Sequence, residues 1–138
     1  LSNEFNFKFF KDRIINKNKN LKNILMDQKF ISGLGNIYVN EILFLSQLNP
    51  RKRSRVLKDY EIRKIIKNTK KILKKSISFG GSSISDFKNA NGKAGNFQQK
   101  FNVYSREKLK CLKQGCYDTI KKTYISNRAT FFCSSCQK

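Results

Sequence analysis

Four stretches of the chain repeat apolar residues every three or four positions, which is the spacing of a helix that packs one face against a core. The expected helices cover residues 2–15, residues 21–27, a third stretch from Ile37 to a stop before Asn49, and a fourth from Asp59 to a stop at Gly80. Two glycines and an asparagine within residues 33–36 predict a tight connection between the second and third helices.

The remainder of the chain changes character twice. Residues 82–99 are rich in Gly, Ser, Asn and Asp and show no period, so we predict a long loop there. Residues typical of strands then follow at Phe101, Val103, Tyr104, Thr119, Ile120, Tyr124, Phe131 and Phe132. The pattern predicts a mainly α protein with a small β part: a helical unit up to about residue 100 and a β-hairpin tail.

The net charge of the chain indicates which class of molecule it binds. The 138 residues hold 30 Lys plus Arg against 9 Asp plus Glu, a net charge of +21, which favours a polyanion and above all nucleic acid. Compositional drift toward Lys is the alternative, although it does not explain the scarcity of acidic residues. An anionic membrane surface fits less well because the cations are spread over several elements. No run of 18 apolar residues occurs, and we expect a cytoplasmic, monomeric protein.

All four cysteines lie in the tail, as Cys111-x4-Cys116 and Cys133-x2-Cys136 with sixteen residues between the pairs. Two close pairs separated by the length of a hairpin predict one tetrahedral zinc ion with a structural role, because four thiolates leave no position open for substrate. Two disulfides are the alternative, disfavoured in a reducing compartment. The chain has no histidine, which excludes a His-ligated metal and a Ser-His-Asp triad.

Several strings of residues carry a resemblance to a known family. They are Leu25-Met26-Asp27-Gln28, Gly33-Leu34-Gly35-Asn36-Ile37-Tyr38 with Glu41, Gly80-Gly81-Ser82-Ser83, Phe97-Gln98, Val103-Tyr104, and residues 127–137 around the second cysteine pair. Together they resemble formamidopyrimidine-DNA glycosylase along the whole chain. The related endonuclease VIII shares the helical and zinc modules, but Asn36-Ile37-Tyr38, Phe97-Gln98 and Val103-Tyr104 favour the former.

The resemblance implies a base-excision repair enzyme with glycosylase and abasic-site lyase activities on oxidised purines such as 8-oxoguanine and formamidopyrimidines. It implies a helix-two-turn-helix domain over residues 1–100, with residues 82–98 closing over a flipped base, and a zinc finger over residues 101–138, together binding damaged double-stranded DNA.

The same resemblance assigns DNA contacts to five residues: Lys17, Lys22, Gly35, Asn36 and Arg128. Gly33 and Gly35 would let the backbone approach a phosphate, and Asn36 would both cap the third helix and bind the phosphate. The family assigns the arginine at position 128 a proton-donating part in the delta elimination. Because a guanidinium hardly ever loses its proton, charge stabilisation and DNA positioning are the physically favoured roles of Arg128.

The family's reacting groups are an amino-terminal proline and an adjacent glutamate, and neither is found here. The chain begins at Leu1, which suggests a piece of a longer protein, and Pro50 is internal, so its nitrogen is an amide. We therefore expect this chain alone to be inactive. Asn127 also stands where the family commonly has Gly, the first cysteine pair is spaced by four residues instead of two, and Lys110 stands where a Pro often precedes the first cysteine.

Other readings remain open from the residues alone. A fragment of an endonuclease VIII-like enzyme would share most of the motifs. A non-enzymatic zinc-ribbon protein that binds nucleic acid needs only the charge and the cysteines, and a zinc-stapled protein-interaction module needs only the cysteines. The glycosylase hypothesis predicts a preference for lesion-bearing duplex, the second alternative predicts none, and the third predicts no salt-dependent DNA affinity.

Overall fold

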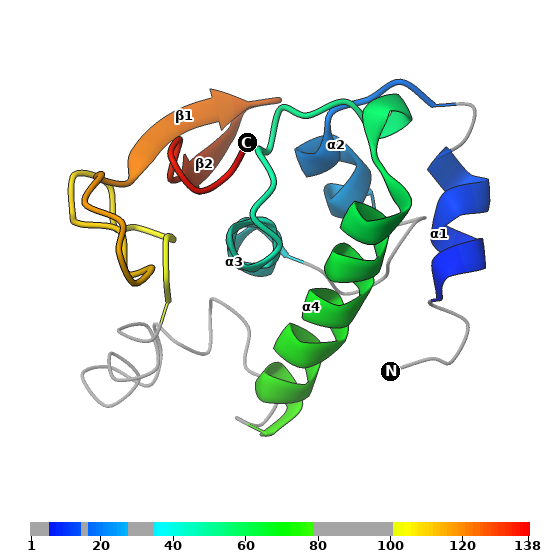
Figure 1. Cartoon of the computed structure of the whole chain (residues 1–138), viewed down its shortest axis with the longest axis horizontal. Helices are drawn as coiled ribbons and strands as arrows, with labels where there is room; N and C mark the ends of the chain where they lie inside the picture. Colours follow the sequence, from blue (N-terminus) through cyan, green and yellow to red (C-terminus); the bar gives the residue numbers. More distant parts are fainter. Residues whose placement is uncertain (1–5, 15–16, 28–34, 79–100) are drawn as a thin grey trace.

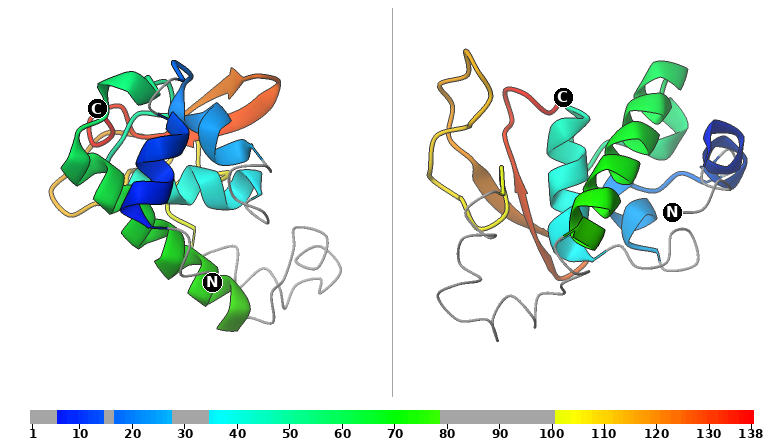
Figure 2. Two further views of the ribbon diagram at one scale, coloured as in Figure 1. Left: turned by 90° about the vertical axis from the view of Figure 1, so that its right-hand side faces the viewer. Right: turned by 90° about the horizontal axis from the view of Figure 1, so that it is seen from below.

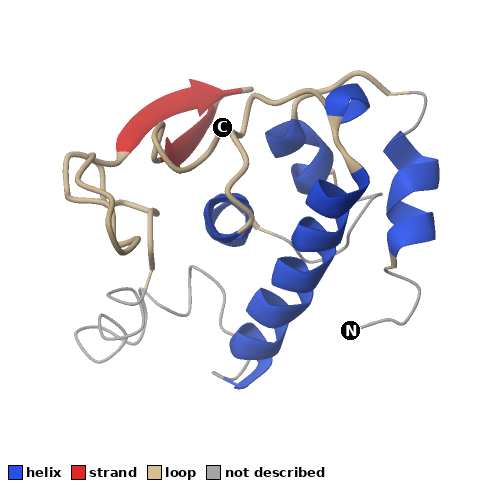
Figure 3. Ribbon diagram, viewed as in Figure 1, coloured by secondary structure: helices blue, strands red, loops and turns tan. Residues whose placement is uncertain are grey.

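A computed structural model describes residues 6–14, 17–27, 35–78 and 101–138 (Figure 1). Within these ranges helices and one hairpin follow in the order α1 Phe7–Ile14, α2 Leu21–Met26, α3 Asn36–Leu45, the 3-10 helix Ser54–Val56, α4 Asp59–Ser78, β1 Lys121–Ile125 and β2 Arg128–Phe132. Figure 3 shows the helices, in blue, grouped apart from the hairpin, in red. The four expected helices are confirmed, but the first begins at Phe7 and not at residue 2 or 3, because Asn6 is not helical, and the third ends at Leu45, before the connection to Pro50.

The longest helix, α4, is amphipathic. Ile62, Ile65 and Ile72 lie on its buried face, whereas its lysines mostly face outward. At its beginning Glu61 Oε1 accepts the backbone N–H of Lys58 at 2.9 Å, so the first turn has an acidic cap of the kind that helix amino termini favour. No helix of the described residues is long and apolar enough to cross a bilayer.

The helices share one cluster of buried side chains. It draws on α1, α2, α3, α4 and the segment after α3, with the members Phe10, Ile14, Leu21, Ile24, Leu25, Val39, Ile42, Leu43, Leu48, Ile62, Ile65, Ile66 and Ile72. Burial of this many large apolar groups is the main stabilising contribution in a domain of this size. The helical unit therefore has a core that does not depend on the cysteines.

Helix α3 lies between the helices and the hairpin (Figures 1 and 2). It contacts α2 and α4 on one side and β2 on the other. Phe44 turns away from the helical cluster and packs with Val103, Cys111, Ile120, Phe131 and Cys133 in a second cluster. Leu45 packs against both clusters, so α3 connects the helical core to the cysteine-bearing tail.

The tail is a short ribbon built on the antiparallel pair β1–β2, in which Ile125 pairs with Arg128 across a two-residue turn. The turn residues Ser126 and Asn127 both have positive φ, at 51° and 65°, which is typical of a type I′ turn. Asparagine tolerates this left-handed conformation, so the turn forms without a glycine at position 127.

The strand expected around Phe101, Val103 and Tyr104 is wrong. Phe101 has no regular structure, and Val103 and Tyr104 lie in a bend and a turn. Their backbone amides do not pair with another strand: the N–H groups of Val103 and Tyr104 donate to the carboxylate of Glu41 on α3, at 2.9 and 3.1 Å. A side chain of α3 has taken the place of a strand partner.

Candidate nucleic-acid interface

The four cysteines of the ribbon meet at one point. Their Sγ atoms all lie within 4.8 Å of one another, with Cys111 to Cys136 at 3.8 Å and Cys116 to Cys133 at 3.7 Å. A disulfide needs about 2.05 Å, so all four are free thiols. Metal–sulfur bonds of about 2.3 Å in a tetrahedron give sulfur–sulfur edges of about 3.8 Å. The cluster has the donor set and the size of a four-cysteine zinc site, as the spacing predicted.

The cysteines differ in their surroundings. Burial raises the pKa of the Cys111 and Cys136 thiols, whereas a hydrogen bond from the backbone of Asp118 lowers the pKa of Cys116. A backbone N–H group also stabilises the sulfur of Cys111, because Lys113 N donates to Cys111 Sγ at 3.5 Å. A zinc ion bound by all four thiolates would hold the two turns together and have no open position, which is a structural role.

Arg128 lies at the tip of the hairpin as the first residue of β2, and its side chain is exposed. Its backbone oxygen accepts a hydrogen bond from Thr130 Oγ1 at 3.0 Å. The guanidinium is therefore accessible to solvent, whereas the backbone of Arg128 is fixed by its hydrogen bond to Thr130. This is the geometry in which an arginine can enter a groove or bind a phosphate with two donors.

Lys22 lies beneath that tip. It is 0% exposed, and its Nζ donates to Thr130 Oγ1 at 2.7 Å and to Ala129 O at 3.3 Å. Burial, and after it the charge of Arg128, lowers the pKa of Lys22 to about 8. The structure therefore brings Lys22 next to Arg128, 106 positions away in the chain, but holds its ammonium on the hairpin.

Asn36 is the first residue of α3, and its Nδ2 donates to Ala129 O at 3.0 Å. The expectation that Asn36 caps the helix is wrong: the N-cap is Gly35, which has no side chain to form a cap bond, and the Asn36 amide bonds to the hairpin instead. A Cβ placed on Gly35 would meet nothing within 4 Å, and its φ of −95° is ordinary. Neither packing nor conformation within the described chain requires a glycine there.

These positions share one side of the molecule. In the right-hand view of Figure 2 the tip of the hairpin, the beginning of α3 and α2 lie along the same edge. The amino terminus of α3 adds a partial positive charge there. Lys17 is exposed in the connection between α1 and α2, where its backbone oxygen accepts Ser54 Oγ at 2.7 Å. Gly33 and the loop 82–98 lie outside the described residues.

Two side chains that hold this arrangement were missed as functional candidates. Asn40 on α3 accepts the backbone N–H of Phe131 at 2.8 Å, and Arg51 donates to Thr123 Oγ1 at 3.0 Å and to Tyr124 O at 3.4 Å. A sequence signal existed for Asn40, because it follows Asn36 by four residues and therefore lies on the same face of a mainly apolar helix. No such signal marked Arg51 among seven arginines.

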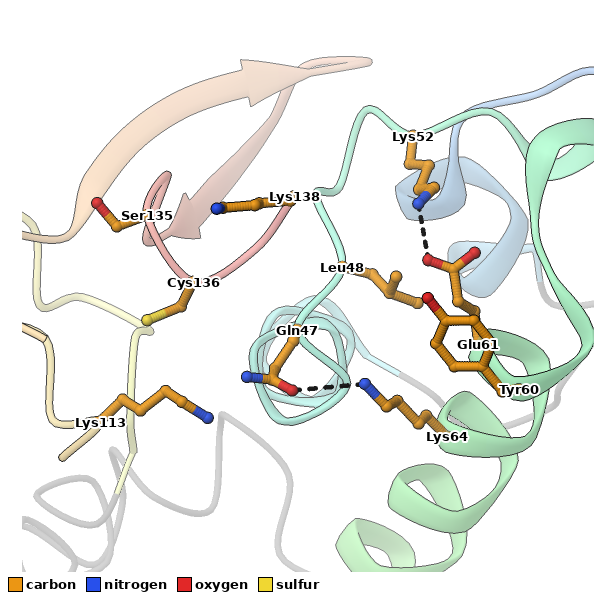
Figure 4. A pocket seen from close by; sticks show the side chains of 10 residues that line it. All are labelled: Gln47, Leu48, Lys52, Tyr60, Glu61, Lys64, Lys113, Ser135, Cys136 and Lys138. Atoms are coloured by element: carbon orange, nitrogen blue, oxygen red, sulfur yellow. Dashed lines mark hydrogen bonds and ion pairs between the residues drawn. The ribbon is translucent and has the colours of Figure 1, made fainter. Parts of the chain in front are cut away.

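A pocket of about 480 Å³ lies elsewhere, at the carboxyl end of α3 (Figure 4). Four lysines line it together with Glu61, which forms an ion pair with Lys52 at 2.7 Å, and Gln47, which accepts from Lys64 at 3.4 Å. Ten residues of helix rise about 15 Å, so the pocket and Asn36 are at opposite ends of α3. Of the predicted site residues, the pocket includes only the zinc ligand Cys136.

A family sequence model described as "Formamidopyrimidine-DNA glycosylase H2TH domain" matches residues 1–88. This chain belongs to the formamidopyrimidine-DNA glycosylase family. Formamidopyrimidine-DNA glycosylases of Rickettsia bellii and Rickettsia felis are 41% and 40% identical over 138 and 137 residues, which is 100% and 99% of this chain but only 50% and 49% of the relatives. The chain thus spans about half the length of these formamidopyrimidine-DNA glycosylases.

Solved structures of the family share the fold. A complex of Lactococcus lactis Fpg with DNA containing an abasic site has a TM-score of 0.85 and 35% identity, over 99% of this chain and 49% of that one. A structure of MutM with DNA containing carbocyclic 8-oxo-G has a TM-score of 0.84 and 34% identity, over 97% and 48%. The chain therefore has the H2TH domain of the formamidopyrimidine-DNA glycosylase family and, after it, the four-cysteine ribbon expected from its motifs.

Proposed function

We propose that this portion holds damaged duplex DNA for a bifunctional glycosylase and abasic-site lyase that acts on oxidised purines. One observation carries the proposal: Lys22 of α2 and Asn36 of α3 both bind the oxygen of Ala129, the residue directly after Arg128. Cationic and amide groups from three separate segments therefore meet at one edge. The amino terminus of α3 and the arginine at the tip provide two kinds of phosphate or groove contact there.

The proposed role of each residue depends on whether its side chain is exposed or buried. Arg128 is exposed and contacts DNA directly, with charge stabilisation and not proton transfer as its contribution to the elimination. The bare backbone at Gly35 lets a phosphate approach the start of α3, and Asn36 and Lys17 add contacts on either side. Lys22 acts from beneath as a buried charge next to the duplex. The units 1–100 and 101–138 bind as one surface, with loop 82–98 closing over an extruded base, and one cytoplasmic monomer supplies all of these DNA contacts.

Binding measurements test the proposal. Fluorescence anisotropy should show salt-dependent binding to an abasic duplex, tighter than to an intact duplex. Arg128→Ala and Asn36→Ala should each weaken abasic-duplex binding by about 1.5 to 3 kcal/mol, the value of a charge-assisted hydrogen bond. Arg55→Ala is the matched control: it removes an exposed arginine from the 3-10 helix and should leave the preference for the abasic duplex unchanged.

The alternatives give different results. Equal affinity for abasic and intact duplex would favour a non-enzymatic nucleic-acid-binding protein, and affinity without salt dependence would favour a protein-interaction module. If Arg128→Ala and Asn36→Ala bind the abasic duplex as the parent does, these two contacts are wrong even though the family is right.

The chain on its own is proposed to be catalytically inactive. The family's Schiff base forms on an amino-terminal proline, whereas Pro50 lies within the chain and its nitrogen is an amide. Borohydride trapping on an abasic duplex should therefore yield no covalent adduct, beside a full-length family member as positive control. An adduct formed at a comparable rate would point to one of the lysines as the nucleophile.

A further inference from the structure

The hairpin presents two backbone groups of β2 to α3. Because Ile125 pairs with Arg128 across a two-residue turn, hydrogen-bonded and non-hydrogen-bonded pairs alternate from that point. The main-chain groups of Ala129 and Phe131 consequently point away from β1. They are the unpaired edge of a two-stranded sheet, a position that ordinarily calls for a third strand or for water.

Two asparagines of α3 occupy that edge. Asn36 Nδ2 donates to Ala129 O at 3.0 Å, and Phe131 N donates to Asn40 Oδ1 at 2.8 Å. The spacing of the asparagines, four residues along a helix, gives about 6 Å, close to the separation of two residues along a strand at about 6.6 Å. One face of α3 therefore matches the repeat of the strand edge.

Asn40 has little freedom to do anything else. It is 1% exposed, and its Nδ2 donates to Asn36 O at 2.8 Å while its Oδ1 receives the amide of Phe131. A buried amide is costly unless its polar atoms are paired. If β2 shifted along α3, the Oδ1 atom of Asn40 and the amide of Phe131 would lose each other as partners, so this pair penalises any other placement of the strand.

We propose that Asn40 is a positioning residue for Arg128. Lys22 also bonds to Thr130 and Arg51 to β1, but Asn40 adds a second bond between α3 and the main chain of β2. With the Ala129 bond alone, α3 would fix the position of β2 but not its direction, whereas bonds at Ala129 and Phe131 fix both. Arg128 directly precedes Ala129, so a rotation of the strand about Ala129 would change the direction in which the Arg128 side chain leaves the backbone and would displace its guanidinium. The inference rests on the proposed contact between Arg128 and DNA. Asn40 would keep Arg128 at a fixed position relative to the start of α3, so that both can contact the same duplex.

A double-mutant cycle tests the proposal in the zinc-loaded chain. Asn40→Leu should weaken binding to the abasic duplex about fivefold, the effect of one lost hydrogen bond, in the parent background. In an Arg128→Ala background the same change should cost less than about twofold, because the residue that Asn40 positions is already gone. Asn68→Leu is the matched control: this asparagine of α4 donates to Ser46 Oγ, in the segment after α3, so its loss should leave binding unchanged. An equal loss in both backgrounds would overturn the proposal.

Amide hydrogen exchange gives a second readout that does not involve DNA. In Asn40→Leu, and in the milder Asn40→Ala, the Phe131 amide should exchange at least about tenfold faster, while the amides of α4 keep their protection. Unchanged exchange at Phe131 would overturn the proposal whatever the binding result. If Arg128→Ala alone leaves DNA binding intact, the proposed DNA contact fails, and the exchange experiment still decides whether Asn40 holds the hairpin.

Discussion

Glu41 Oε2 accepts the backbone N–H of Val103 at 2.9 Å, which joins the middle of α3 to the first residues of the ribbon. The same oxygen accepts Tyr104 N at 3.1 Å, and Oε1 accepts Asn102 N at 2.7 Å and Asn102 Nδ2 at 3.1 Å. Glu41 is 2% exposed, so these donors replace the water that would otherwise solvate the carboxylate. A single side chain orders three consecutive residues of a different segment.

Glu41→Gln should therefore destabilise the chain by about 2 to 3 kcal/mol. The substitution removes the charge that strengthens these hydrogen bonds, and it turns an NH2 group toward backbone donors. Denaturant unfolding monitored by circular dichroism measures the loss. Glu107→Gln is the matched control, because its ion pair with Lys122 at 3.6 Å is partly exposed and should change stability by less than about 0.5 kcal/mol. Equal stabilities of the two variants would contradict this role for Glu41.

The Glu41 contact explains why one part of the fold could not be predicted. The residues around Val103 have strand-forming side chains, and sequence reasoning assigned them to a strand. Their hydrogen-bond partner is a carboxylate about sixty residues earlier, which no local pattern reveals. The helices were predictable because each carries its own period, and their observed ends are shorter where caps such as the Asn6 Oδ1 to Phe9 N bond decide the boundary.

The zinc ligands of the site could be predicted from the sequence, whereas the positions of its other side chains could not. Cysteine spacing contains the geometry of the metal centre, so the ligand set followed from the sequence. The burial of Lys22 did not, because a lysine among so many is expected on the surface and only the packing of the hairpin covers it. The positions of Asn36 and Asn40 against β2 depend on the hairpin register, which sequence alone does not give.

Removal of zinc should unfold the ribbon and leave the helices folded. The buried cluster of the tail includes Cys111 and Cys133, so its packing depends on the turns that the metal holds, whereas the helical cluster contains no cysteine. A strong chelator should abolish the hydrogen-exchange protection of Ile120 but not of Ile65. Metal analysis should give one zinc per chain, and Cys133→Ser should reproduce the effect of the chelator. Retained protection at Ile120 after complete removal of zinc would contradict this prediction.

Lys22 should make stability depend on pH in a specific window. Its folded-state pKa of about 8 is below the ordinary value of 10.5, so below pH 8 the ammonium is charged in both the folded and unfolded states. Between these two values the folded state releases the proton and the unfolded state keeps it, so the free energy of unfolding rises with pH. The parent should gain more stability between pH 8 and 10 than Lys22→Met does. The parent is compared with Lys22→Met because loss of net positive charge as the pH rises stabilises both proteins. Equal gains in the two proteins would contradict the prediction.

The hairpin turn offers a substitution that should stabilise the protein. Ser126 and Asn127 both have positive φ, and serine is poorly suited to that conformation, whereas Asn-Gly is the favoured pair for a type I′ turn. Ser126→Asn combined with Asn127→Gly should stabilise the hairpin by about 1 kcal/mol, and Ser126→Ala combined with Asn127→Ala should destabilise it, because alanine at positive φ is strained. Hydrogen exchange of the β1 and β2 amides measures both changes, with α4 amides as the internal reference.

Because Arg128 directly follows the turn, a stabilising effect without loss of DNA binding would mean that the new turn keeps the register that Ile125 and Arg128 define. A change of opposite sign in either variant would mean that the turn is not of this type.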